Sequence, residues 1–160
     1  MSFDVFLQRF EKGEIADVPR QPVRDVLAAT SNGGPDEYGF YNVTFPDGVD
    51  VEFSAKELES TQRFTGCVFH IHSFGNDLLK FILEVARAGG MVIIPAMEGN
   101  TLILISETQE ADLPRDLQHE FRSVVVNSPG ELGAVLQRGF NGWSAYRDHV
   151  LRQSTKGNET

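Results

Sequence analysis

Alternating apolar and polar residues predict β-strands in the first half of the chain. The clearest pair covers residues 38–45 and 49–53, and the Pro-Asp-Gly at 46–48 between them is typical of a tight turn. In the second run, apolar side chains at odd positions alternate with polar ones, so one face is expected to be buried and the other to face water. Shorter patterns of this kind predict strands over 2–8 and 64–72.

Two further runs, residues 91–96 and 101–106, are apolar at successive positions instead. Such runs are typical of strands that are covered on both faces, so this hairpin is expected near the centre of a sheet. Residues 9–18 and 107–114 show no periodic pattern and are expected to be polar connections. One more short strand is predicted over residues 123–126.

Apolar residues at helical spacing predict the helices of the chain. They cover residues 19–30, 76–88, 116–122, a segment that starts at Ser128 and a last segment over 143–153. The helix over 76–88 is apolar on more than one side and is expected to be central, with Asn76 as its cap and Gly89-Gly90 as its end. Ser128 and Glu131 have the spacing of a capping box.

The order of these elements predicts an α+β domain with a mostly antiparallel sheet of about six to seven strands. We expect helices packed on one face, two C-terminal helices, a single globular domain over residues 1–153 and a disordered tail over 154–160. The sheet residues expected to pack against the helix over 76–88 are Phe3, Val5, Cys67, Phe69, Ile71, Val92, Ile94, Leu102 and Leu104.

The chain is acidic, with 23 Asp and Glu against 14 Lys and Arg and a net charge of −9. Nucleic acids and membrane surfaces attract clustered positive charge, so neither is expected as a partner. Residues 31–60 alone hold seven acids against one lysine. The first ten residues lack the pattern of a signal peptide and the chain has one cysteine, so a cytoplasmic location is expected.

His70 and His72 form the one pattern with the spacing of metal ligands. Residues two apart on a strand point to the same face, so both imidazoles are expected to converge on one ion or ligand. By residue type, a third ligand could come from Asp4, Asp77, His119 or His149. The alternatives are a pocket role without metal and two imidazoles on a solvated sheet face. Because structural zinc sites are normally four-coordinate, we expect no stoichiometric metal and no cofactor.

Cys67 and the segment after it offer no second catalytic pattern. The thiol lies among apolar residues, where desolvation disfavours the thiolate, so it is expected to be a core cysteine. Asp77 puts a negative charge in the first turn of the next helix, which favours capping over phosphate binding. The sequence holds no nucleophile elbow, zinc-protease motif, kinase motif or EF-hand loop, so a non-enzymatic role is favoured.

Three kinds of function agree with these observations. The leading hypothesis is a small acidic protein-interaction module whose face for a basic partner carries Asp36, Glu37, Asp47, Asp50, Glu52, Glu57 and Glu59. In composition alone, the chain is similar to many bacterial immunity and antitoxin proteins, which implies an inhibitor of a basic partner. The alternative is a small ligand-binding protein or enzyme that uses the strand face of His70 and His72, with Asp77 as a further candidate. A structural or oligomer-forming domain is the third.

Overall fold

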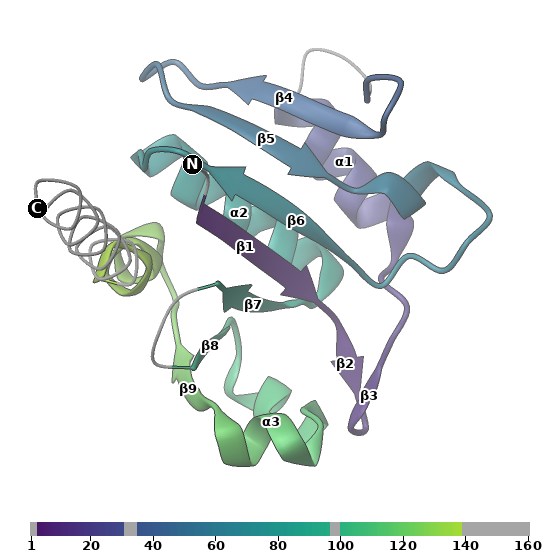
Figure 1. Ribbon diagram of the computed structural model, residues 1–160, viewed down its shortest axis with the longest axis vertical. Helices are drawn as coiled ribbons and strands as arrows, with labels where there is room; N and C mark the ends of the chain where they lie inside the picture. Colours follow the sequence, from purple (N-terminus) through teal and green to yellow (C-terminus); the bar gives the residue numbers. More distant parts are fainter. Residues whose placement is uncertain (1–2, 31–34, 97–99, 139–160) are drawn as a thin grey trace, which may run out of the picture.

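The architecture is a seven-stranded sheet with helices on both sides, in a computed structural model that describes residues 3–30, 35–96 and 100–138 (Figure 1). The strands lie in the spatial order β4 (Phe40–Thr44), β5 (Asp50–Ser54), β6 (Gly66–Ile71), β1 (Phe3–Gln8), β7 (Val92–Pro95), β8 (Thr101–Leu104) and β9 (Arg122–Val125). Every neighbouring pair is antiparallel except β8 and β9, which are parallel. The predicted α+β class with a mostly antiparallel sheet is therefore confirmed.

Helices cover one face of this sheet along its length and the other face in part. Behind the strands in Figure 1 lie α1 (Arg20–Thr30) and α2 (Asn76–Gly89), and the helix over residues 129–138 adds Leu132 and Leu136 to the same core. On the opposite face, the 3-10 helix η2 (Glu107–Asp112) and α3 (Arg115–Glu120) accompany a second cluster on β7 and β8. The short helix α3 thus departs from the expectation that the helices share one face.

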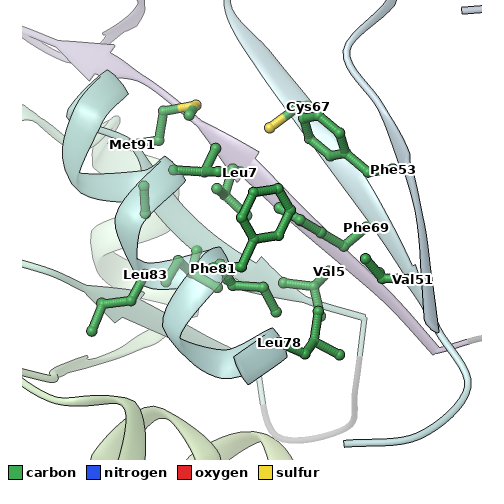
Figure 2. Packing of buried hydrophobic residues seen from close by; sticks show 14 of the residues in the cluster. Val5, Leu7, Val51, Phe53, Cys67, Phe69, Leu78, Phe81, Leu83 and Met91 are labelled. Atoms are coloured by element: carbon green, nitrogen blue, oxygen red, sulfur yellow. The ribbon is translucent and has the colours of Figure 1, made fainter. Parts of the chain in front are cut away.

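The centre of the main core is supplied by α2. Its Phe81 meets the rings of Phe53 on β5 and Phe69 on β6, with centroids 6.2 and 5.7 Å away and ring planes nearly perpendicular (Figure 2). Edge-to-face pairs of this kind add a favourable quadrupole contact to the burial of large rings. The helix is covered on other sides as well, because α1 packs along it and Leu79 touches the helix over 129–138 at Gly133. Its predicted central position is confirmed.

The expected core residues divide between two clusters. Those on β1 and β6 (Phe3, Val5, Cys67, Phe69 and Ile71) pack in the main core with α2, as predicted. Those on β7 and β8 do not: Val92, Leu102 and Leu104, with half-buried Ile94, belong to the second cluster around Leu113. Ile93 and Ile103 take their place in the main core. The prediction was wrong here because strands covered on both faces have no polar alternation to show which residues face which side.

The ends of α2 also differ from expectation at one residue. The residue before the helix, Gly75, is the N-cap and makes no side-chain cap, so Asn76 is the first helical residue rather than the cap. A Cβ at Gly75 would collide with the carboxylate of Asp47 and with Val49, so the β4–β5 turn approaches the helix start closely. At that place the positive end of the helix dipole stabilises the negative charge of the Asp47 carboxylate. At the other end, Gly90 takes the left-handed conformation (φ 62°) and ends the helix as expected.

The two segments expected to be polar connections contain short regular structure. Residues 9–18 hold a small hairpin of β2 (Phe10–Glu11) and β3 (Glu14–Ile15), joined by Lys12 and Gly13, which both have positive φ. The backbone N–H groups of these two turn residues donate to Asp112, the last residue of η2. The pairing of β2 with β3 is supported by this contact with a distant segment, so the sequence of residues 9–18 shows no periodic pattern that would predict it.

Of the two hydrogen bonds in the predicted capping box, the one to the Ser128 side chain is confirmed at the start of the helix over 129–138. The hydroxyl of Ser128 accepts a hydrogen bond from the backbone N–H of Glu131 at 3.1 Å. The predicted helix over 143–153 and the tail over 154–160 lie outside the described residues. Within residues 3–30, 35–96 and 100–138, no helix is long and apolar enough to cross a bilayer.

Replacing Ile82 with alanine should lower the free energy of unfolding by about 2–5 kcal/mol, because the side chain is fully buried and leaves a cavity in the core. Urea denaturation followed by circular dichroism measures the change. The control is Lys80→Ala on the exposed side of the same helix, which should cost less than about 0.5 kcal/mol. Equal effects of the two substitutions would show that α2 is not the centre of the core.

Candidate interaction surface

One half of the sheet has a face that no described helix covers. Over β7 and β8 this face carries η2 and α3, whereas over β4, β5, β6 and β1 it lies in front in Figure 1 without a helix above it. We call this half the open face. Its side chains come from alternate positions of the four strands: Asp4, Phe6, Gln8, Phe40, Asn42, Thr44, Asp50, Glu52, Ser54, Val68 and His70.

A row of mainly apolar residues crosses the open face. Strand register places Phe40 beside Ser54, Ser54 beside Val68, Val68 beside Phe6 and Phe6 beside Ile94. Phe6 is 45% exposed, one of three large hydrophobic residues with such exposure in the described chain. Aromatic residues are enriched among those that contribute most to binding in protein contacts, so an exposed phenylalanine within an apolar row is a candidate contact residue. The sequence shows Phe6 as an apolar residue at an outward position, but it gives no sign of the row.

A polar row runs beside the apolar one. It joins Asn42, Glu52, His70 and Asp4 across the same four strands. Nδ1 of His70 lies 2.8 Å from a carboxylate oxygen of Asp4, and the two side chains are 26% and 36% exposed. The ring of Phe40 lies 6.1 Å from that of His70. His70 therefore interacts with both rows, with Asp4 in the polar row and with Phe40 in the apolar row.

The predicted histidine site is not assembled as a metal centre in the described chain. His70 turns to the open face and Asp4, one of the proposed third ligands, lies beside it. His72 is an exposed residue just beyond β6, and Asp77 lies in the first turn of α2. His119 belongs to α3 at the covered end, while His149 lies outside the described residues. Among residues 3–30, 35–96 and 100–138, no three potential ligands form a group.

The Asp4–His70 pair has one element of a catalytic arrangement, because a carboxylate that holds an imidazole is the orienting half of a triad. The other half is a hydroxyl or thiol on the second ring nitrogen. No such group of the described segments forms a hydrogen bond to His70, and Cys67 on the same strand points into the core (Figure 2). The arrangement supports orientation of a polar contact rather than nucleophilic chemistry.

The seven acidic residues predicted to share one surface are divided among several roles. Asp36 accepts hydrogen bonds from the backbone N–H groups of Tyr38 and Phe40, and Asp47 accepts one from Val49, so both shape turns. Glu59 forms an ion pair with Arg24 of α1 at 2.8 Å. Asp50 and Glu52 lie together on the open face. The last two, Glu37 in the turn before β4 and Glu57 in the 3-10 helix η1 (Lys56–Glu59), lie apart from them.

Most described basic residues are occupied within the molecule, and Arg20 is the clearest case. Its guanidinium donates to the backbone carbonyl oxygens of Glu57, Leu58, Ser60 and Gln62, at 2.5 to 3.1 Å, and lies over the ring of Phe64. One side chain thus fixes a segment that has little regular structure of its own. Arg63 pairs with Asp17, and Arg9 and Arg87 donate to backbone carbonyl groups. The open face itself carries Asp4, Asp50 and Glu52 but no Lys or Arg.

The segment held by Arg20 forms one wall of a groove at the edge of the open face. The groove has a volume of about 530 Å³ and is lined by Phe6, Gln8, Ser54, Lys56, Glu57, Gln62, Arg63, Thr65, Gly66 and Val68, among others. One of its lining residues is Gly66, where an added Cβ would lie only 2.2 Å from the carbonyl oxygen of Leu7, so the neighbouring strand leaves no room for a side chain. Charges of both signs stand at its rim, so the groove suits a polar segment of a larger partner better than an apolar small molecule.

Comparison of the chain with models of protein families, with curated proteins and with solved structures gives no significant match. Arguments about function therefore rest on the chemistry of the open face.

Cys67 is confirmed as a core cysteine, and burial raises the pKa of its thiol far above the usual value. Alkylation by iodoacetamide at pH 8 should therefore be at least about 100-fold slower in the native protein than in urea, since the thiolate is both scarce and inaccessible. Mass spectrometry of timed samples gives both rates. Similar rates in the two conditions would contradict the buried position.

Replacing Arg20 with methionine should loosen the segment over residues 57–62, because four carbonyl groups lose the Arg20 donor. Arg24 still donates to Leu58 and Ser60 still donates to Glu57, so the effect should be largest at Ser60 and Gln62. We expect a loss of about 1–3 kcal/mol in the free energy of unfolding and faster hydrogen exchange in residues 57–64. Gln21→Ala, at an exposed position of the same helix turn, is the control. Unchanged exchange in the segment would show that it is held by other contacts.

Proposed function

We propose that this protein is an interaction module that binds a basic protein partner through the open face. The observation that supports this most is the half-covered sheet: the same face is sealed by η2 and α3 over β7 and β8 and left exposed over β4, β5, β6 and β1. The exposed half includes Phe6, which lies on β1 next to the covered half and is 45% exposed.

The composition of the open face resembles that of a protein–protein contact. Such contacts combine a central aromatic or aliphatic anchor with a polar rim. Here Phe6 and Val68 are the apolar centre, and Glu52, His70 and Asp4 form a polar margin along one side. The row is presented by rigid strands, so little conformational entropy is lost when a partner binds.

The charges favour a partner with lysine and arginine side chains. Asp50 and Glu52 are exposed and have no Lys or Arg beside them on the open face, where His70 is the neighbour of Glu52, and the chain as a whole has a net charge of −9. A negative field of this kind speeds the approach of a positive surface and opposes contact between two copies through the same face. Inhibition of a basic protein, in the manner of an immunity protein or antitoxin, is the specific role we propose.

The ligand-binding or enzymatic alternative has the Asp4–His70 pair in its favour. His72 and Asp77, the other two predicted residues, do not join that pair in the structure. The groove next to the open face does not include His70 among its lining residues. These placements support the interaction module over a reaction centre.

The proposal predicts two separable effects on binding to a basic partner captured from the native host. Neutralising the open face with Asp50→Asn and Glu52→Gln should slow association at least about threefold at low salt and remove much of its salt dependence. Phe6→Ala should leave association nearly unchanged and speed dissociation about tenfold or more, because it removes the apolar anchor. Surface plasmon resonance at two salt concentrations measures both rates.

The matched control is Glu107→Gln with Glu110→Gln, which removes the same charge from η2 at the covered end of the sheet. All variants should keep the wild-type circular dichroism spectrum, because none of these side chains is buried. Binding that ignores both Phe6→Ala and the open-face double substitution would place the contact elsewhere and refute the proposal.

A further inference from the structure

The groove beside the open face contains a backbone donor and a backbone acceptor that the fold leaves without a partner. Both belong to Gly66, the half-buried first residue of β6, which is part of the lining of the groove. Their direction follows from the two peptide units on either side of Gly66, because the other group of each unit is paired with β1.

The N–H of Gly66 points away from β1. The carbonyl oxygen of Thr65, in the same peptide unit, accepts a hydrogen bond from the backbone N–H of Arg9 at 3.0 Å. In a trans peptide unit the N–H and the C=O point in opposite directions, and the described chain has no cis peptide bond. The N–H of Gly66 is therefore directed to the side on which β5 pairs with β6.

The C=O of Gly66 points the same way. Hydrogen-bonded pairs occupy every second position of an antiparallel ladder, and the register places Leu7 opposite Cys67, two positions along from the bond just described. Leu7 and Cys67 are therefore the next hydrogen-bonded pair. The N–H of Cys67 points to β1, so the C=O of Gly66 in the same peptide unit points away from it.

Strand β5 ends before it can meet these two groups. Its last residue, Ser54, pairs with Val68, and the chain then turns into η1. In a longer β5, Lys56 would lie opposite Gly66, but the ladder does not extend to that pair. Within the described residues, neither backbone group of Gly66 forms a hydrogen bond. The space that β5 leaves is the groove, which Lys56 and Gly66 both line.

We infer that this groove binds an extended peptide segment of the partner, which pairs with Gly66 where β5 no longer does. One residue of the segment accepts a hydrogen bond from the N–H of Gly66 and donates one to its C=O, as in a hydrogen-bonded pair of an antiparallel sheet. A bare anion would meet the C=O and a bare cation the N–H, whereas a peptide satisfies both groups. The inference rests on the proposed function, because the open face is what brings the partner to the groove.

Charge adds an acidic side chain to the description of the segment. The charged residues of the lining are Lys56, Arg63 and Glu57, two cations against one anion. Arg63 is already paired with Asp17, while exposed Lys56 forms no ion pair with any described residue. A partner that is basic over the open face and has an Asp or Glu in this segment would match both surfaces, and the two opposite charges would fix its orientation.

The groove is formed before the segment binds. Its outer wall is held by Arg20 through the carbonyl groups of residues 57–62, and β6 is held by β1. Little ordering of the protein is therefore needed, but one pair of backbone bonds and one ion pair limit the affinity. We expect a dissociation constant of about 10 μM to 1 mM for the segment as an isolated peptide.

The test begins with a phage library of random heptapeptides, selected on the full chain, and continues with the enriched peptides in synthetic form. These peptides should contain Asp or Glu. In NMR spectra of the protein, their binding should shift the amide resonance of Gly66 and slow its hydrogen exchange at least about threefold. The amide of Cys67, which points to β1, is the internal control and should keep its exchange rate.

Methylating the peptide nitrogens one at a time tests the backbone pairing directly. At the residue that pairs with Gly66, N-methylation removes the donor to its C=O and should weaken binding at least about tenfold, measured by isothermal titration calorimetry. At the two adjacent residues the N–H groups of an extended segment point the other way, so methylation there should change the affinity less than about threefold.

The acidic side chain is tested on the protein. Lys56→Met keeps most of the side-chain length and should weaken the enriched peptides at least about fivefold at low salt. The matched control, Lys80→Met at an exposed position of α2, should leave their affinity unchanged. Circular dichroism checks that both variants fold.

Three results overturn the inference: a library that yields no peptide acting on Gly66, a peptide that tolerates methylation at every nitrogen, and equal effects of the two lysine substitutions. None of these assays involves Asp50 or Glu52, so such a failure leaves the proposed function standing. Association of the captured partner that ignores the open-face substitutions refutes the proposed function instead.

Discussion

Phe69 and Phe81 join the sheet to α2 at the middle of the core, and the orientation of every neighbouring strand follows from that contact. With Phe69 facing the helix, Val68 and His70 on either side of it must face the other way. Strand register passes this alternation to β1 and β5, where Asp4, Phe6 and Glu52 take the outward positions. The composition of the open face is therefore a direct result of how the core is packed.

On the side of the sheet away from α2, one half is covered by short helices and the other half, the open face, is not, and there is a physical reason for this difference. On β7 and β8 the outward residues are Val92, Leu102 and Leu104, whose exposure would cost about 1.5–3 kcal/mol each, so η2 and α3 cover them. On β5 and β6 the outward residues include Glu52 and His70, which remain hydrated without cost. Phe6 and Val68 are the exceptions in this hydrated half, because they leave apolar surface in contact with water.

Much of the fold could be predicted because local patterns agree with tertiary positions. Val51 and Phe53 alternate with exposed residues, Gly48 takes a positive φ in the turn, and Gly90 ends α2. The orientation of β7 and β8 could not be predicted, since Ile93 and Leu102 look alike in a sequence and differ only in what covers them. The parallel pairing of β9 and the hairpin at Lys12–Gly13 depend on contacts far along the chain.

The candidate surface was predictable only in fragments. Cys67 and His70 are an odd number of residues apart on one strand, which puts His70 on the face opposite the core cysteine, but its partner Asp4 is 66 positions away and was one candidate among several. Asp50 and Glu52 could be assigned to an exposed face from alternation alone. The remaining predicted acids could not be assigned, because turn geometry uses Asp36 and Asp47, and Arg24 neutralises Glu59.

The way Arg20 holds residues 57–62 has a consequence for how this protein can change over generations. The guanidinium binds carbonyl oxygens, which every amino acid possesses, so this part of the anchoring does not depend on the side chains of the segment, whereas Leu58 anchors it through burial in the core. Substitutions at the exposed side chain of Gln62, whose carbonyl group is what Arg20 binds, can therefore alter the chemistry of the groove while its outline stays the same. A wall that is held through its backbone leaves exposed side chains open to substitution, and this suits the interaction role proposed above, because specificity can change there without a new fold.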